Sequence, residues 1–235
     1  YEVLHTFDGP VDGRAPVGSL TAWRGWLYGV AGAGGVSDSG TLFRIRADGS
    51  DFAVLQTFSG ATDDGHHPSG TPVVGDGVLY GTTYRGGLWD AGTVYSINLD
   101  GTEYRAVYSF GPAEADGFSP TQKLVFDDGV LYGTTRSGGE WGVGTVFRVS
   151  SDGSGHEVIH SFTSTGSDHA YPNGSLAMVS GRLYGAVEKG VEGALGMLFR
   201  IESDGRDFEI LHVFDGPPDV GGFIGTVTPV FSRGV

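Results

Sequence analysis

The tripeptide Leu-Tyr-Gly occurs four times in this chain, beginning at Leu27, Leu79, Leu131 and Leu183, and each copy follows the previous one by 52 residues. A fixed register over four copies is the sequence signature of a repeat architecture, and it limits the possible folds more than any other feature. Other residues keep the same step: Gly34, Gly86, Gly138 and Gly190; Asp48, Asp100, Asp152 and Asp204; Phe58, Phe110, Phe162 and Phe214.

Each copy contains four short strand-like runs, which we call strands a, b, c and d. In the fourth copy they cover residues 174–181, 182–187, 196–205 and 207–214, and the third run ends in an Asp-Gly turn. Asp-Gly between two alternating runs is a strong hairpin signal because glycine tolerates positive φ. A four-stranded antiparallel unit of about 50 residues is typical of a β-propeller blade, and a β-solenoid, whose repeats are usually shorter, is the alternative.

The sequence therefore predicts an all-β protein: a β-propeller of about five blades, each with four antiparallel strands, in one domain over residues 1–235. Its predicted parts are an N-terminal strand at 1–7, repeats at about 18–58, 69–110, 121–162 and 173–214, and a C-terminal strand at 225–235.

The fifth blade contains only strands a and d in this sequence. Three explanations remain open: the natural chain is longer and this one is trimmed, the fifth blade is a reduced one, or another copy completes it. In a kelch-like ring the N-terminal strand would close the last blade. Because unpaired strand edges are templates for pairing, we expect self-association through them.

The connections predict the orientation of each blade. The a–b and c–d turns are short, whereas the d–a connection, such as residues 59–70, is the longest. We therefore expect strand a to be innermost and strand d outermost, and the b–c and d–a loops to share one face.

The pattern LYGTT..GG....GTVF.....DG.....V..SF resembles the GloVer tandem-repeat family, whose members are expected to be propellers of secreted or surface-anchored bacterial proteins. The order of strands is also similar to that of a kelch repeat. The resemblance implies an exported protein, located outside the cell or on its surface. It supplies no catalytic residues to transfer to this sequence.

The composition excludes several classes of partner. The chain has 28 acidic and 14 basic side chains, a formal net charge of −14 and no cysteine. This balance argues against binding to nucleic acid or to anionic lipid, both of which need a basic surface. No apolar run of about 20 residues is present, so no membrane insertion is expected.

Two groups of residues are candidates for binding metal. The first is a set of carboxylates that recurs in the d–a loops and would suit Ca²⁺, the one ion we consider as a cofactor; the second is a histidine pair beside one of them, which would suit a transition metal. Ordinary turn chemistry, in which each carboxylate caps backbone N–H groups, is the alternative for the first group, and a solvated loop for the second. The residues are Asp12, Asp64, Asp116 and Asp168, with His66 and His67.

The best candidates for binding a small ligand are two tryptophans in the b–c loops, 52 residues apart. Aromatic rings flanked by polar groups suit the faces of sugars, which makes a glycan the expected ligand. The alternative is that each tryptophan fills the groove between two blades. The residues are Arg85, Trp89, Asp90, Arg136, Glu140 and Trp141.

No catalytic motif is present: the chain lacks G-x-S-x-G, a P-loop and H-E-x-x-H. The leading interpretation is a non-enzymatic extracellular scaffold, binding or surface protein that assembles into oligomers or filaments through its strand edges. The alternative is a carbohydrate-binding or carbohydrate-active propeller that uses the b–c and d–a loop face. Residues 188–196 and 215–225 depart from the repeat, as the loops of an asymmetric active site would.

Overall fold

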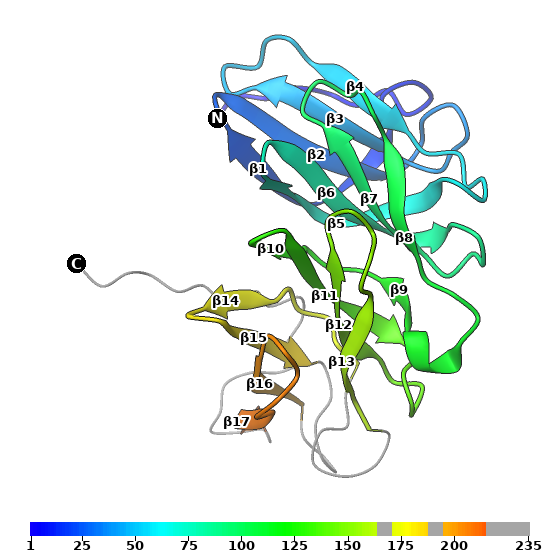
Figure 1. Cartoon of the computed structure of the whole chain (residues 1–235). Helices are drawn as coiled ribbons and strands as arrows, with labels where there is room; N and C mark the ends of the chain where they lie inside the picture. Colours follow the sequence, from blue (N-terminus) through cyan, green and yellow to red (C-terminus); the bar gives the residue numbers. More distant parts are fainter. Residues whose placement is uncertain (164–170, 188–194, 215–235) are drawn as a thin grey trace.

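The computed structural model describes residues 1–163, 171–187 and 195–214. Figure 1 shows four antiparallel sheets that follow one another along the chain, each built from strands that are consecutive in sequence. Within the described residues, the one helical element is a 3₁₀ turn, η1 (Glu114–Asp116). No helix in this part of the chain is long and apolar enough to cross a membrane. The all-β propeller prediction is confirmed.

Each sheet corresponds to one copy of the repeat and forms one blade. Blade 1 consists of β1 (Arg14–Trp23), β2 (Trp26–Ala33), β3 (Thr41–Arg46) and β4 (Ala53–Thr57). Blade 2 consists of β5 (Gly65–Gly75), β6 (Val78–Gly86), β7 (Thr93–Asn98) and β8 (Arg105–Ser109). Blade 3 consists of β9 (Phe118–Pro120), β10 (Val125–Asp127), β11 (Val130–Ser137), β12 (Thr145–Ser150) and β13 (Glu157–Ser161). Blade 4 consists of β14 (Ala177–Val179), β15 (Arg182–Val187), β16 (Gly196–Glu202) and β17 (Glu209–Phe214).

The glycine of each Leu-Tyr-Gly pairs with an aromatic residue of strand c, as Gly133 does with Phe147. A Cβ atom on Gly133 would lie 2.6 Å from Phe147 Cζ and 2.7 Å from Leu124 Cδ2. Since real Cβ atoms do not approach other atoms this closely, glycine is needed here so that the aromatic ring can cover the strand. The same pairing occurs in the other three blades, at Gly29, Gly81 and Gly185.

The inner strands differ from the predicted boundaries. In the first two blades strand a begins before residues 18 and 69, at Arg14 and Gly65, and contains an irregular register in its middle. In blade 3 it is divided into β9 and β10. These breaks coincide with close approaches between neighbouring blades: a Cβ atom on Gly18 would lie 3.0 Å from Thr71 Oγ1. Contacts with another blade, which the repeat pattern does not encode, therefore set where strand a bends.

Strand a is the innermost strand of each blade, as expected. The backbone N–H of Ser19 in β1 donates to Thr71 Oγ1 in β5 at 2.8 Å, and the hydroxyl of Ser69 donates to the carbonyl of Pro120 in β9 at 2.9 Å. These bonds join the inner strands of successive blades. Strand d pairs only with strand c of its own sheet and forms the outer edge.

The N-terminal residues 1–7 form no strand, in contrast to the prediction. A strand d needs a strand c to pair with, and none from a preceding blade exists among the described residues. The segment nevertheless packs as a strand d would. The ring centroids of Phe7 and Phe43 lie 5.1 Å apart, which is the same distance as between the ring centroids of Phe110 and Phe147. The predicted strand at 225–235 lies outside the described residues.

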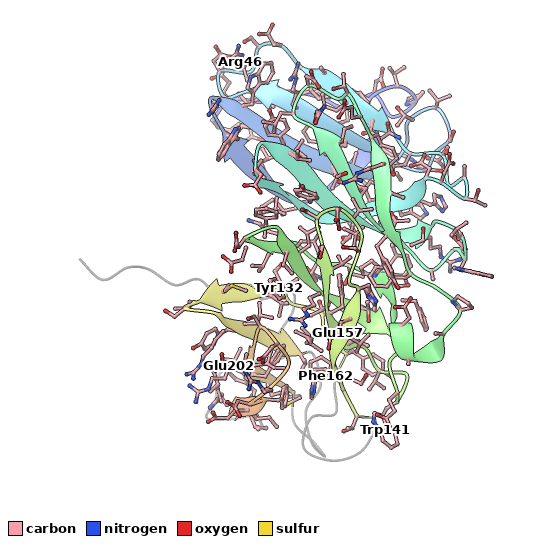
Figure 2. All side chains as sticks on the ribbon, in the orientation of Figure 1. Arg46, Tyr132, Trp141, Glu157, Phe162 and Glu202 are labelled. Carbon is pink, nitrogen blue, oxygen red and sulfur yellow. The ribbon has the colours of Figure 1, made fainter. Side chains whose placement is uncertain are left out.

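The hydrophobic core lies between blades. Each of three buried clusters combines side chains from two successive blades. The terminal phenylalanine of strand d contributes to all three and is fully buried, as at Phe58, Phe110 and Phe162. Figure 2 labels Phe162 and Tyr132 of blade 3, which belong to the cluster shared with blade 4. Because each blade buries its apolar face only against its neighbours, the repeat is stable as a stack rather than as single units.

Candidate ligand-binding surfaces

The b–c and d–a loops share one face of the molecule, as predicted from the turn lengths. The N–H of Gly35 donates to Gly9 O at 2.8 Å, and the N–H of Gly87 donates to Asp64 O at 2.7 Å. Each bond joins a b–c loop to the d–a loop beside it. We call this side of the molecule the loop face. In Figure 2, Trp141 lies in a b–c loop at the lower right, whereas Arg46 and Glu202 lie beside c–d turns.

Trp89 is exposed on the loop face, beside the boundary between blades 2 and 3. The residue is 58% exposed, and its ring lies beside Gly111 in the following d–a loop. It lines a shallow hollow of about 510 Å³ together with loop residues 111–113, 115 and 116 and the start of β13. The ring therefore lies at the edge of a hollow between blades 2 and 3 and, at this exposure, does not fill it.

Trp141 is also exposed, at 49% of its surface, and lines a different hollow of about 470 Å³. Phe118, itself exposed, and Glu140 lie in the same wall. Of the six residues predicted to bind a ligand, Trp89 lines one hollow and Glu140 and Trp141 line the other. The other three, Arg85, Asp90 and Arg136, line neither. The six residues do not form a single site.

The other residues predicted to bind a ligand are the charged residues Arg85, Asp90 and Arg136. The first two form an ion pair with each other, and the third forms no ion pair with any described residue. Asp90 accepts the N–H of Gly86 at 2.9 Å and pairs with Arg85 at 3.2 Å, so this ion pair closes its own b–c loop. In blade 1, Asp38 likewise accepts the N–H of Gly34 at 2.9 Å, but its partner Arg14 belongs to strand a, at the start of β1. Arg136 is exposed and forms no ion pair within the described residues.

The floor of the Trp89 hollow is a buried polar network around Asp116. Its carboxylate accepts the Tyr108 hydroxyl at 2.8 Å and the Gly111 N–H at 2.7 Å, and lies 3.3 Å from His156 Nδ1. Burial lowers the pKa of His156, although Asp116 acts in the opposite direction. Burial and the hydrogen bond to Asp116 raise the pKa of Tyr108. The hollow therefore presents hydrogen-bond acceptors beside an exposed aromatic ring.

The recurring d–a carboxylates cap backbone groups, as the turn interpretation predicted. Asp12 accepts the N–H groups of Asp8 at 2.9 Å and Gly9 at 3.2 Å, and its other oxygen lies 2.7 Å from His5 Nε2. Asp64 accepts the N–H and hydroxyl of Ser59, both at 2.7 Å. Asp116 makes the bonds given above, and Asp168 lies outside the described residues.

No three histidine, aspartate or glutamate side chains lie close enough to hold a metal ion, as far as the described residues go. The three described carboxylates belong to three different blades and each is engaged in its own turn. Calcium binding remains a prediction.

His66 and His67 do not point to opposite faces of their strand, as adjacent strand residues would. His67 has φ of 55°, and the two rings stack with centroids 3.9 Å apart. The positive φ turns the side chain onto the same side as that of its neighbour. His67 Nδ1 donates to the carbonyl of Gly32 in blade 1 at 2.8 Å, so the ring joins two blades.

One hollow was not predicted at all. It lies where the inner strands of blades 1, 2 and 3 meet, has a volume of about 640 Å³, and includes Ser175 of blade 4 in its wall. We call it the axial hollow. Among the described residues in its wall, the ionisable side chains are His67, Tyr84 and Lys123. A search for repeated residues misses it because its chemistry depends on Lys123, at a position where the other copies have Ser19, Thr71 and Ser175.

Comparisons with known proteins agree with this architecture. A family model described as the Gloeobacter/Verrucomicrobia repeat matches residues 33–228. No curated protein sequence matches the chain.

Among solved structures, similar folds occur in the crystal structure of a nidogen/laminin complex and in TolB from Acinetobacter baumannii. The first has a TM-score of 0.62 at 13% identity, with 93% of this chain and 70% of that chain covered. TolB has a TM-score of 0.54 at 17% identity, with 91% of this chain and 47% of TolB covered. At such low identity these similarities concern the propeller fold alone.

Proposed function

The chain belongs to the Gloeobacter/Verrucomicrobia repeat family, and from this membership and the loop geometry we propose that it is a non-enzymatic binding module, exported to the cell surface or beyond, that holds neutral glycans on its loop face. The propeller fold and the repeat family agree with a scaffold or binding role. The observation that carries the glycan proposal is the exposure of Trp89 above the acceptor-rich hollow around Asp116.

The chemistry of this hollow suits a neutral sugar. An exposed indole offers a flat apolar face for the C–H groups of a pyranose ring. Glu157 also lines the hollow, beside Asp116. Carboxylates accept hydrogen bonds from sugar hydroxyls, whereas they would repel an anionic ligand. Trp141, one blade further on, would contact a second unit of an extended glycan.

The test is isothermal titration with neutral hexasaccharides of glucose, xylose and mannose. We expect measurable binding by wild type and at least a tenfold loss in Trp89→Ala, with a smaller loss in Trp141→Ala. Trp23→Ala is the matched control: Trp23 is 38% exposed but adjoins the a–b turn, away from the loop face. Absence of binding, or equal losses in Trp89→Ala and Trp23→Ala, would refute the proposal.

A parallel assay for new reducing ends distinguishes this proposal from the carbohydrate-active enzyme. Turnover that disappears in Asp116→Asn would favour the enzyme. Binding without turnover supports the binding module.

Self-association is a second candidate function, and a separate observation favours it. Leu124 and Leu176 are buried against the preceding blade, at 2% and 4% exposure, whereas their counterpart Leu20 in blade 1 is 49% exposed. Leu20 lines an apolar hollow of about 340 Å³ with Leu4, Phe7, Phe43 and Ile45, which we call the open face of blade 1. Every other such face is covered by a blade of the same repeat. A second copy of the chain is therefore the occupant we propose.

Analytical ultracentrifugation over a range of concentrations tests this second proposal. We expect dimers or larger assemblies that dissociate in Leu20→Glu and persist in Leu211→Glu. Leu211 is 42% exposed and lies on the outer strand β17, so it is a matched control away from the open face. A wild type that stays monomeric at every concentration contradicts self-association.

A further inference from the structure

The axial hollow has the features of a small-molecule site that is separate from the loop-face hollows. Its volume of about 640 Å³ falls within the range of roughly 300–1,000 Å³ typical of such sites. Residues that are far apart in sequence, from Val17 in β1 to Ser175 before β14, form its wall. The site therefore exists only when successive blades are packed together.

The charge of this hollow is opposite to that of the chain as a whole. The chain has 28 acidic side chains, yet none of those in the described residues lines the hollow, and Lys123 is the one described lysine or arginine in its wall. Lys123 is half-buried and forms no ion pair with any described residue. A half-buried ammonium without a carboxylate partner gains most from an anionic ligand, because each compensates the charge of the other.

The other polar groups in the wall suit a ligand with hydroxyl groups. The hydroxyl of Tyr84 has no hydrogen-bond partner in the described part of the chain, and its ring supplies a flat apolar surface. Thr71 Oγ1 accepts the N–H of Ser19, which leaves its own proton free to be donated. His67 donates through Nδ1 to Gly32, so its Nε2 is the ring atom left for a ligand.

We propose that the axial hollow binds a small hydroxylated carboxylate, with the chemistry of a sugar acid, and that Lys123 pairs with its carboxylate. Tyr84, Thr71 and His67 would contact the hydroxyl groups. This ligand class differs from the neutral glycan of the loop face, whose hollow carries carboxylates. The two sites can therefore be tested independently.

The experiment is a titration of the folded chain followed by two-dimensional amide NMR. The probes are D-glucuronate and D-galacturonate, with D-glucose and D-galactose as matched neutral sugars and inorganic phosphate as a simple anion. We expect saturable shifts at Ser19, Thr71 and Lys123 with a uronate, and at least tenfold weaker binding of the neutral sugars and of phosphate. Affinity for the uronate should also fall as salt is raised, because the ion pair is partly exposed.

Four variants make the result specific. Lys123→Gln should weaken uronate binding at least tenfold, and Lys123→Arg, which keeps the charge, should restore most of it. Arg24→Gln, which removes the same charge from the exposed a–b turn, and Trp89→Ala should leave it unchanged. The spectrum of each free variant establishes that it is folded.

The inference is overturned by any of four results. These are no saturable binding of either uronate, equal affinity in Lys123→Gln, equal affinity for phosphate, or a loss of uronate binding in Trp89→Ala. The last result would place the acid on the loop face instead. A failure of the neutral glycan to bind would concern the proposed function and leave the axial site standing.

Discussion

The ring of Phe7 meets the ring of Phe43 edge-on, with centroids 5.1 Å apart and an interplanar angle of 67°. Phe110 and Phe147 meet at the same 5.1 Å across the boundary between blades 2 and 3. Phe7 thus occupies the position of the last residue of a strand d, although its own segment forms no strand. The N-terminal segment lines part of the open face of blade 1 with Leu4 and Phe7.

Because Phe7 and Phe110 differ in burial, replacing each ring with alanine should cost different amounts of stability. Phe110 is fully buried, whereas Phe7 is only half-buried. Phe110→Ala should lower the free energy of unfolding by about 3–5 kcal/mol, the usual cost of removing a buried phenylalanine ring. Phe7→Ala should cost less than half as much, because water already reaches its ring. Urea unfolding of both variants measures this, and equal losses would contradict the assignment.

The close packing of Gly133 predicts that even a methyl group is too large there. Gly133→Ala should lower the free energy of unfolding by about 1–3 kcal/mol, since the added Cβ overlaps the Phe147 ring and Leu124 and forces them to move. Gly77→Asn is the control, because nothing lies within 4 Å of a Cβ there and asparagine tolerates its φ of 80°. We expect the urea midpoint to fall for Gly133→Ala and to stay unchanged for Gly77→Asn. If both variants lose stability equally, overpacking is not the cause.

The cap formed by Asp12 predicts a dependence of stability on acid pH. Burial acts to raise the pKa of Asp12, but hydrogen bonds from His5, Asp8 and Gly9 outweigh it and lower the pKa from 3.8 to about 2. The folded state therefore favours the carboxylate, which contributes about 2 kcal/mol above pH 4. That contribution should disappear as pH falls from about 4 to 2.

Asp12→Asn removes this titration while keeping the size of the side chain. Wild type should exceed the variant in unfolding free energy at pH 6, and the difference should shrink as the pH approaches 2. Urea unfolding of both proteins across this range is the measurement. A difference that does not change with pH would mean that the cap does not depend on charge.

The burial of His156 predicts a second dependence of stability on pH, at higher pH values than the one expected from Asp12. Burial lowers its pKa despite the nearby Asp116, and its Nε2 is buried without a partner in the described chain. The folded state therefore favours the neutral ring, so stability should be complete above about pH 6.5, the ordinary histidine value, and fall as pH drops below it.

His156→Phe should remove this pH dependence. The phenyl ring can keep the stacking on Tyr108, where the two rings now lie 4.0 Å apart and nearly parallel. Thermal unfolding between pH 5 and 7.5 should show a steeper loss for wild type than for the variant. Identical slopes would assign the pH dependence to other groups.

The repeat alone predicted strands b, c and d of every described blade. Their alternating patterns and Asp-Gly turns act over a few residues, so a local signal suffices. The capping of the d–a loops by Asp12, Asp64 and Asp116 was predictable for the same reason. A carboxylate near the turn it stabilises needs no information about distant parts of the chain.

Where strand a bends was decided by the tertiary structure. Gly18 and Gly70 lie against the inner strand of the next blade, and the ladder becomes irregular beside them. The stacking of His66 on His67 could not be read from the repeat because it depends on the positive φ at His67, where the chain enters the inner strand. Two bonds to blade 1, from its backbone N–H to Ser39 and from its ring to Gly32, accompany that conformation.

The sequence by itself thus determined the architecture: a period of 52 residues, four strands in each unit and the face to which each loop belongs. Only the tertiary structure decided the candidate chemistry. It placed Trp89 on the surface above Asp116, divided the two tryptophans between separate hollows and put Lys123 into a hollow that no described carboxylate lines. The physical reason is that the repeated residues specify the contacts that every blade makes within itself and with its neighbours. A binding site arises instead where one copy departs from the others, and its neighbours in space belong to different blades.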